Sequence, residues 1–265
     1  MEKISKAQVK FVRSLQLKKV RDAEGLFVAE GEKCVEELRR GFELVSLYRE
    51  GENATRTEIE QMSSLKTPQG VIGVFKKSVS PKDGLSGEAG LILVLDGIQD
   101  PGNLGTIIRT CDWFGVHEIV CSRDTADCYN PKVVQATMGA LARVNLRYLD
   151  LVEWLSPLRL PHKGGEQMRI YGTLLDGKNM YEVLSGEAGL SASKASGLCS
   201  VSEQSERSVI IMGNEGNGIS AEVRKFITDP IYIPTYPNKE TSDVVESLNV
   251  SIATAIVLAE FRRPR

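Results

Sequence analysis

Five consecutive apolar residues, LILVL at 91–95, open the larger part of this chain. A strand buried on both faces of a parallel sheet has this continuous apolar character, whereas a half-exposed strand alternates. Further candidate strands lie near 118–120, 143–149, 169–175, 208–212 and 230–233, and helical stretches separate them. Strands that alternate with helices predict an α/β fold with a doubly wound parallel sheet, whose site lies at the carboxyl ends of the strands.

One of the helices between these strands has a clear start signal. Asn130 precedes Pro131, a pairing typical of an N-cap followed by the first helical residue. The apolar pattern that follows predicts a helix through Leu141.

The N-terminal part has its own, shorter alternation. The sequence predicts strands at LFVAEG (26–31), ELVSLYRE (43–50) and GVIGVF (70–75), a helix at EKCVEELRRG (32–41), and a polar segment containing TRTEIEQM (55–62). We therefore predict a small α/β domain over 1–78, a Ser/Gly/Pro-rich linker over 79–90, and a second domain over 91–265 with a mobile loop at about 185–207.

Composition limits the possible functions. The chain carries 33 Lys and Arg against 35 Asp and Glu, a formal net charge of −2, unlike a polybasic nucleic-acid binder. No apolar run approaches the roughly 18 residues that a membrane-spanning helix needs. The 5 cysteines form no CxxC pair, which favours a reducing compartment, and the 2 histidines, His117 and His162, are far apart. We expect a cytoplasmic protein without a metal ion or a membrane partner.

Basic residues are concentrated at the N-terminus. Residues 1–21 hold one acid, Glu2, and seven basic side chains: Lys3, Lys6, Lys10, Arg13, Lys18, Lys19 and Arg21. One interpretation is a solvated, partly frayed helix. The other is an arm that contacts nucleic-acid phosphates, which needs an independent indication of RNA chemistry elsewhere in the chain.

The segment after the LILVL strand, at 96–115, is the first candidate site. Residues 100–103 predict a turn, Gly105 a close backbone approach, and residues 106–113 a helix with Arg109 about one turn in. Asn103 and Arg109 are six residues apart, so both can face a ligand at the helix N-terminus, a position that favours anions. A capped turn followed by a surface arginine explains the same residues without a function.

Two further segments follow strands. In SVIIMGNEGNGIS at 208–220 the glycine spacing matches neither a dinucleotide nor a triphosphate fingerprint, and the strand opens into a flexible loop with one acid, Glu215. In the segment 230–263 a proline-punctuated loop precedes an apolar helix, and Ser247 is placed to be its N-cap. Asn249 falls in the first turn, where asparagine is a poor helix former, so it is harder to explain without a function.

Taken in order, these three segments resemble the signature motifs of the SpoU (TrmH-type) RNA 2′-O-ribose methyltransferases, a branch of the SPOUT superfamily. The resemblance covers nearly the whole chain, because FVAEGEKCVEEL and LKTPQGVIGVF look like the substrate-binding domain of many such enzymes. It implies an α/β methyltransferase domain with a trefoil knot, preceded by a small α/β RNA-binding domain. It also implies S-adenosylmethionine as the cofactor, RNA as the substrate, and a homodimer with the site near the subunit interface.

Site residues are carried over by their positions in the matching motifs. The resemblance implies a catalytic set of Asn103, Arg109, Glu215, Ser247 and Asn249. It implies contacts to S-adenosylmethionine from Gly213, Ile233 and Leu248. The chain departs from the family pattern at 235–246, where TYPNKETSDVVE separates the motif-three proline from Ser247.

The resemblance assigns Arg109 to the ribose 2′-hydroxyl. Since a guanidinium normally carries its proton near neutral pH, we expect Arg109 to orient the hydroxyl and to stabilise developing negative charge, whether or not it accepts the proton. Glu215 would fix Arg109 or Asn103, and Ser247 and Asn249 would hold an RNA phosphate or the arginine. The N-terminal domain would recognise RNA, with ribosomal RNA favoured over transfer RNA by analogy, through Lys18, Lys19 and Arg21.

Two other functions stay open, and two are disfavoured by the motifs. A non-catalytic RNA-binding protein that kept the fold would show an altered cofactor loop, and the insertion before Ser247 is compatible with that. Transfer RNA is the alternative substrate. A base methyltransferase of the superfamily would lack the NLGTIIR and SLN combination, and an oxidoreductase would need a phosphate fingerprint that this chain lacks.

Overall fold

The computed structural model describes residues 4–78, 90–159, 168–185, 208–236 and 247–263. Contacts divide the chain into two compact units: unit 1 contains residues 1–83, 100–112 and 126–145, and unit 2 contains residues 84–99, 113–125 and 146–265. The predicted linker and the predicted mobile loop lie, but for one residue each, outside the described residues. The predicted domain boundaries stay a prediction.

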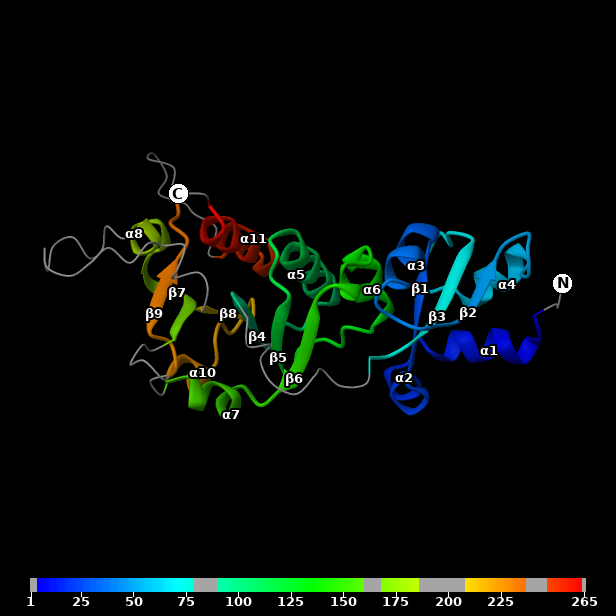
Figure 1. Cartoon of the computed structure of the whole chain (residues 1–265), viewed down its shortest axis with the longest axis horizontal. Helices are drawn as coiled ribbons and strands as arrows, with labels where there is room; N and C mark the ends of the chain where they lie inside the picture. Colours follow the sequence, from blue (N-terminus) through cyan, green and yellow to red (C-terminus); the bar gives the residue numbers. More distant parts are fainter. Residues whose placement is uncertain (1–3, 79–89, 160–167, 186–207, 237–246, 264–265) are drawn as a thin grey trace, which may run out of the picture. The chain divides into compact units, whose positions relative to one another are not determined.

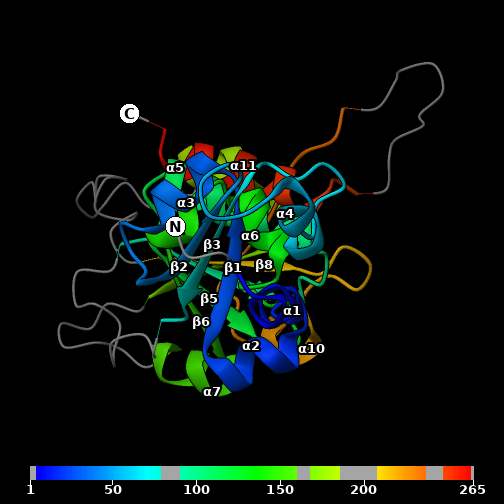
Figure 2. The ribbon, with the colours of Figure 1, turned by 90° about the vertical axis from the view of Figure 1, so that its right-hand side faces the viewer.

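Unit 1 contains a three-stranded antiparallel sheet in the order β1-β3-β2, whose strands lie side by side in Figures 1 and 2. Its elements are α1 (Lys6–Ser14), α2 (Lys18–Glu24), β1 (Leu26–Glu30), α3 (Glu32–Leu38), β2 (Leu44–Arg49), α4 (Arg56–Met62), β3 (Val71–Lys76), α5 (Pro101–Trp113, whose last residue falls in unit 2), α6 (Pro131–Thr137) and the short 3₁₀ helix η1 (Ala140–Ala142). The three predicted strands and the helix at 32–41 are confirmed.

The two faces of this sheet have different partners because side chains alternate along each strand. Val28 lies opposite Val74 and Phe27 opposite Phe75 in the β1–β3 register. The valine face joins α1 and α4 in one buried cluster. On the other face Phe27 stacks on Phe75, with ring centroids 5.6 Å apart, and lies 4.8 Å from the ring of Tyr129, just before α6. This aromatic contact ties residues 126–145 to the N-terminal sheet.

Two helices of unit 1 differ from the prediction. TRTEIEQM is a helix, α4, because Thr55 and Glu58 form a capping box in which each side chain accepts the other's backbone N–H. The helix that begins after the Asn130 cap was predicted to reach Leu141, but α6 ends at Thr137. Met138 adopts a left-handed conformation, with φ at +51°, and this ends the α-helical hydrogen bonding.

Unit 2 contains a six-stranded sheet in the order β6-β5-β4-β8-β7-β9. Its elements are β4 (Ile92–Asp96), β5 (Glu118–Ser122), β6 (Asn145–Leu149, whose first residue falls in unit 1), α7 (Leu151–Leu155), η2 (Ser156–Arg159), β7 (Arg169–Asn179), α8 (Met180–Ser185), β8 (Ser208–Gly213), α10 (Ala221–Arg224), β9 (Asp229–Tyr232) and α11 (Val250–Phe261). β4 pairs in parallel with β5 and β8, and β7 does so with β8 and β9, which confirms the predicted parallel sheet.

Both faces of β4 and β8 are buried, as their unbroken apolar sequences predict. One face contributes Ile92, Val94, Val209 and Ile211 to a core cluster that α7 and α10 complete. α11 contacts β8 and α8, and its Phe261 packs edge to face on Tyr171 of β7 with ring centroids 4.9 Å apart. In the described part of the chain, no helix combines the length and the apolar character needed to cross a membrane.

The order of the strands reverses at the β4–β8 pair. From β4 the chain continues outward to β5 and then β6, whereas β8, β7 and β9 lie on its other side. Asp96 at the end of β4 lies in register with Gly213 at the end of β8. Such a switch point, at the carboxyl ends of parallel strands, is where α/β sheets bind their ligands.

Candidate active site

Hydrogen bonds join the ends of three neighbouring strands at this edge of the unit 2 sheet. The carboxylate of Asp96 accepts from the backbone N–H of Ser220 at 2.7 Å. Gly97, whose φ is +71°, donates its N–H to Ser122 Oγ at 2.8 Å, and its carbonyl accepts from Asn214 Nδ2 at 2.7 Å. The edge is therefore fixed by Asp96, Ser122 and Asn214, which sequence reasoning missed. Their signal is a polar residue placed directly after a buried strand.

The segment that carries Glu215 is a tight turn rather than the predicted flexible loop. Asn214 and Gly218 exchange two backbone hydrogen bonds of 3.0 and 2.9 Å. The side-chain oxygen of Asn214 accepts from the N–H groups of Gly216 and Asn217 at 2.9 and 3.1 Å. These two amides are therefore used by Asn214 and not by the neighbouring Glu215. Glu215 lies at the exposed tip of the turn.

Helix α5 begins earlier than predicted. Asp100 Oδ1 accepts from the N–H of Asn103 at 2.8 Å, so the helix starts at Pro101 and not at Thr106. Arg109 consequently lies more than two turns into the helix, not one. Asn103 and Arg109 are separated by about 9 Å along the axis and by about 120° around it. The two side chains therefore do not share the helix N-terminus.

The burial of α5 separates its structural residues from its exposed ones. A methyl group on Gly105 would lie 2.5 Å from Cβ of Ala136, so the predicted close approach at this glycine is to α6. Asn103 is half-buried and Arg109 is exposed. Among the described residues, Arg109 has no hydrogen-bond or ion-pair partner. Its guanidinium therefore makes no polar contact that stabilises the described part of the fold.

At the third segment the capping residue is Asn249 and not Ser247. The side-chain oxygen of Asn249 accepts from the N–H groups of Ser251 and Ile252 at 2.9 and 3.4 Å and from Ser251 Oγ at 2.6 Å. A cap explains asparagine here without a ligand, which reverses the interpretation made from the sequence. Ser247 and Leu248 precede the helix and are exposed. Most of the insertion, residues 237–246, lies outside the described part.

The three predicted contacts to S-adenosylmethionine all belong to unit 2. A methyl group on Gly213 would overlap the backbone of Gly218 and Ile219, so the turn itself requires this glycine. Ile233 follows β9 directly and is half-buried. Leu248 has 48% of its surface exposed, which offers an apolar side chain to an adenosyl ring. Ile233 and Leu248 could make apolar contacts and Gly213 backbone contacts only, and all three cofactor contacts stay predictions.

The predicted catalytic residues are divided between the two units. Asn103 and Arg109 belong to unit 1, and Glu215, Ser247 and Asn249 belong to unit 2. Their convergence in one pocket stays a prediction. Within the described ranges, no group of three or more His, Cys, Asp or Glu side chains is arranged to hold a metal ion.

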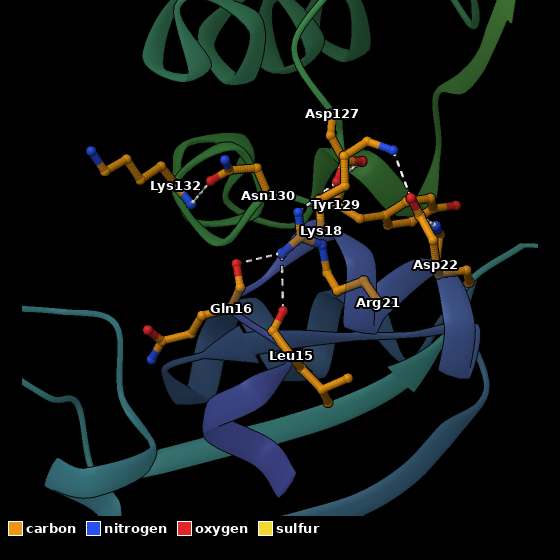
Figure 3. A network of polar contacts seen from close by, with 10 residues as sticks. Leu15, Gln16, Lys18, Arg21, Asp22, Asp127, Tyr129, Asn130 and Lys132 are labelled. Atoms are coloured by element: carbon orange, nitrogen blue, oxygen red, sulfur yellow. Dashed lines mark hydrogen bonds and ion pairs between the residues drawn. The ribbon is translucent and has the colours of Figure 1, made fainter. Parts of the chain in front are cut away.

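The predicted RNA contacts Lys18, Lys19 and Arg21 have three different environments. Arg21 is 1% exposed and donates to the carbonyls of Leu15 and Gln16 at 3.0 and 2.7 Å (Figure 3). It also forms an ion pair of 2.6 Å with Asp127. The prediction is wrong for Arg21, because a buried and paired guanidinium cannot reach a phosphate.

The two lysines of α2 are at the surface. Lys18 pairs with Asp22 at 2.7 Å, and this hydrogen bond raises the pKa of the lysine. Hydrogen bonds from Lys18 and Lys77 lower the pKa of Asp22 to about 2. Lys19 is exposed and has no ion pair with a described residue. Of the three predicted RNA contacts, Lys19 alone keeps a charge that no described residue compensates.

Comparisons with known proteins match nearly the whole chain. Residues 90–259 match the model of the SpoU rRNA Methylase family, and residues 6–57 match that of the MRM3-like substrate binding domain. The 23S rRNA (guanosine(2553)-2′-O)-methyltransferase RlmP of Bacillus subtilis is 27% identical over 99% of this chain and 98% of that protein. The 23S rRNA (guanosine-2′-O-)-methyltransferase RlmB of Neisseria meningitidis is 32% identical over 74% of this chain and 70% of that protein.

Solved structures share the same architecture. A Porphyromonas gingivalis protein of the TrmH family superposes with a TM-score of 0.78 at 36% identity, over 98% of both chains. The AdoMet-bound rRNA methyltransferase from Sinorhizobium meliloti superposes with a TM-score of 0.76 at 27% identity, over 99% of this chain and 97% of that one.

Proposed function

This chain belongs to the SpoU rRNA Methylase family, and on that premise we propose that it transfers the methyl group of S-adenosylmethionine to a ribose 2′-hydroxyl of ribosomal RNA. The observation that carries the proposal is the family match over residues 90–259, which spans every strand from β4 to β9 and most of α11. The ribosomal substrate is supported by the relatives named for 23S rRNA, which match up to 99% of this chain.

Several predictions from the sequence are confirmed. The family is the predicted one, and the α/β fold class with a parallel sheet and a small N-terminal domain is as expected. The chain is a methyltransferase, and S-adenosylmethionine is its methyl donor.

Arg109 is the residue that we propose to act on the ribose. Its exposure and its lack of a partner among the described residues support this role. A guanidinium carries its proton near neutral pH and cannot accept another, so Arg109 would donate to the 2′-oxygen and stabilise the charge that develops there. The hydroxyl proton would pass to water, and S-adenosylhomocysteine would leave as the methyl group is transferred. Glu215, at the exposed tip of its turn, would orient Arg109 or Asn103.

The other motif residues would hold the reactants. S-adenosylmethionine supplies the electrophilic methyl group when bound. Leu248 and Ile233 would bind its adenosyl part through apolar contact, and the backbone at Gly213 would bind its polar groups. Asn249 would be a positioning residue, because its cap fixes where α11 begins and so where Ser247 and Leu248 lie. Holding both reactants in line can contribute about 7–11 kcal/mol to the rate.

The finer features implied by the resemblance are proposals as well. A homodimer is supported by exposed apolar side chains at the start of α11, where Ile252 is 52% exposed and stands close in sequence to the exposed Leu248. We also propose the trefoil knot and a cytoplasmic location, which suits a modifier of ribosomal RNA. The match to a substrate binding domain at residues 6–57 supports RNA recognition by the N-terminal part.

The test has two readouts. Titration calorimetry with S-adenosylmethionine, with and without RNA, should show binding, and transfer of a labelled methyl group to deproteinised ribosomal RNA should follow. Mapping 2′-O-methyl positions in RNA from cells that lack the gene then identifies the nucleotide. Cofactor binding with no transfer to ribosomal RNA but transfer to transfer RNA would change the substrate. Absence of both binding and transfer would favour the non-catalytic RNA-binding protein.

A further inference from the structure

A row of three cations runs along one side of α1. Lys6, Lys10 and Arg13 follow the i, i+4, i+7 spacing of a helix face, and all three are exposed. At 100° per residue they fall within about 60° of the helix circumference, and they span about 10 Å of its length. Val9 and Val12 are buried and anchor the same helix on the unit 1 sheet, so the row is held at a fixed orientation.

None of these cations is neutralised within the described part of the chain, where Lys6, Lys10 and Arg13 have no ion pair. Other exposed arginines of unit 1 do pair: Arg39 with Glu36 at 3.0 Å, Arg40 with Glu37 at 3.3 Å, and Arg56 with Glu60 at 2.8 Å. The row is therefore a local concentration of uncompensated charge in a chain whose net charge is −2.

The positions of these cations do not stabilise helix α1. The first turn of α1 has no acid, and Lys6 occupies its first position, where the helix dipole favours a negative charge. The capping box of Ser5 and Gln8 holds this end instead. A residue that breaks a local rule without a structural gain is a candidate for function.

An aromatic ring accompanies the cations. Phe11 is 39% exposed, although its neighbours Val9 and Val12 are buried. It makes no ring contact with another described aromatic residue. At 100° per residue it lies about 100° from Lys10, 140° from Lys6 and 160° from Arg13 around the helix, so the ring and the row occupy the two flanks of the exposed side of α1. Cations together with an exposed ring are the combination with which proteins bind single-stranded nucleic acid, through phosphates and base stacking, and a strand that crosses the exposed side of α1 would meet both.

We propose that α1 binds a single-stranded segment of the RNA substrate, with Lys6, Lys10 and Arg13 on successive phosphates and with Phe11 stacked on an unpaired base. This inference rests on the proposed function, since the ligand is the RNA to be methylated. It replaces the predicted contact at Arg21, which is buried, and adds α1 to the predicted contacts at Lys18 and Lys19.

The charge row is tested by salt dependence. The variant Lys6→Gln/Lys10→Gln/Arg13→Gln keeps the helix propensity and removes three charges. Its affinity for a short single-stranded RNA of mixed sequence should fall, and the slope of log K against log salt should shrink by about 2, at about 0.7 for each lost phosphate contact. The matched control Arg39→Gln/Arg40→Gln/Arg56→Gln removes the same charge from paired residues and should keep the slope. Equal slopes for the two triple variants would overturn the proposal.

The ring is tested by comparing RNA forms. Phe11→Leu keeps an apolar side chain but removes the stacking face, so single-stranded RNA should bind between about fivefold and a hundredfold more weakly, with an unchanged salt slope. A blunt RNA duplex should bind the variant as well as the native protein. An equal loss on both RNA forms, or no loss, would refute stacking by Phe11.

Methylation separates this inference from the proposed function. If the native enzyme methylates ribosomal RNA and the α1 triple variant does so with an unchanged KM, only the role of α1 fails. If the variant raises KM while saturating RNA restores kcat, the role is supported. If the native enzyme neither binds RNA nor transfers a methyl group to it, both proposals fail.

Discussion

Replacing Asp127 by asparagine should destabilise unit 1 far more than the loss of an exposed ion pair would. The side chains of Arg21 and Asp127 are 2% and 13% exposed, and their charged atoms lie 2.6 Å apart. Asparagine keeps the volume and the ability to accept from the N–H of Tyr129, which Asp127 Oδ1 now does at 3.0 Å. It cannot neutralise the guanidinium, so the variant leaves a buried cation without its counter-charge.

The expected magnitude follows from this environment. Removing one partner of a buried pair costs about 3–5 kcal/mol. Two carbonyls, those of Leu15 and Gln16, still accept from Arg21 after the substitution. We therefore expect the lower end, about 3 kcal/mol, which raises the opening equilibrium more than a hundredfold.

The assay is hydrogen exchange of the α1, α2 and β1 amides, with urea unfolding followed by circular dichroism. Asp22→Asn is the control, because Asp22 pairs with Lys18 and Lys77 at the surface, and each such pair should be worth at most about 1 kcal/mol. Adding Arg21→Met to Asp127→Asn should recover part of the loss, since the unpaired charge is then gone. If Asp127→Asn costs no more than Asp22→Asn, or the double variant is less stable still, the reasoning is refuted.

The remaining predictions concern single residues. Arg109→Ala should keep its affinity for S-adenosylmethionine, measured by calorimetry, but lose turnover in the methyl-transfer assay. Arg109→Lys should also turn over poorly, because the point charge of an ammonium group does not reproduce the planar guanidinium. Near-native turnover of Arg109→Ala would contradict the assigned role. Asn249→Ala should cost about 1 kcal/mol of stability through loss of the α11 cap, whereas Asn249→Asp should be nearly neutral in thermal unfolding. Gly105→Ala should be destabilising in urea although alanine favours helices, because its methyl group would lie 2.5 Å from Cβ of Ala136. The pKa of Asp22 is lowered to about 2, so the stability that its carboxylate contributes is complete above about pH 4 and is lost as the pH falls toward 2. Between pH 4 and pH 2, the urea midpoint of Asp22→Asn should therefore change less than the midpoint of the native protein.

The strands could be predicted because their signal is local. LILVL and SVIIM are unbroken apolar runs, and burial on both faces is the environment that such runs need. The α4 helix was missed even though its capping box is also local, since its polar composition hides its few buried residues, Ile59 and Met62. The local signal of α4 is therefore present in its cap and not in its apolar pattern.

Long-range contacts explain the other errors. Arg21 belongs to a basic cluster in the sequence, but its partner Asp127 is 106 residues away, and nothing near Arg21 indicates its burial. The early start of α5 depends on Asp100, whose side chain could cap a helix or close a turn from the same sequence. The division of the catalytic set between two units likewise has no sequence signal, because it reflects packing of α5 and α6 on residues far from them in the chain.

The structural roles of the motif residues sharpen the functional hypothesis. Gly105, Gly213 and Asn249 are each accounted for by packing, a turn or a cap, so their presence in the motifs follows in part from the fold. Arg109 and Leu248 are different, because both are exposed in the part of the chain that the structure describes, and no described contact needs their particular chemistry. At a motif position that no described contact requires, a ligand or a partner subunit can account for the residue, and we propose a ligand for Arg109 and Leu248. Substituting Arg109 or Leu248 should therefore reduce activity while leaving stability nearly unchanged, the opposite of what Gly105→Ala should do.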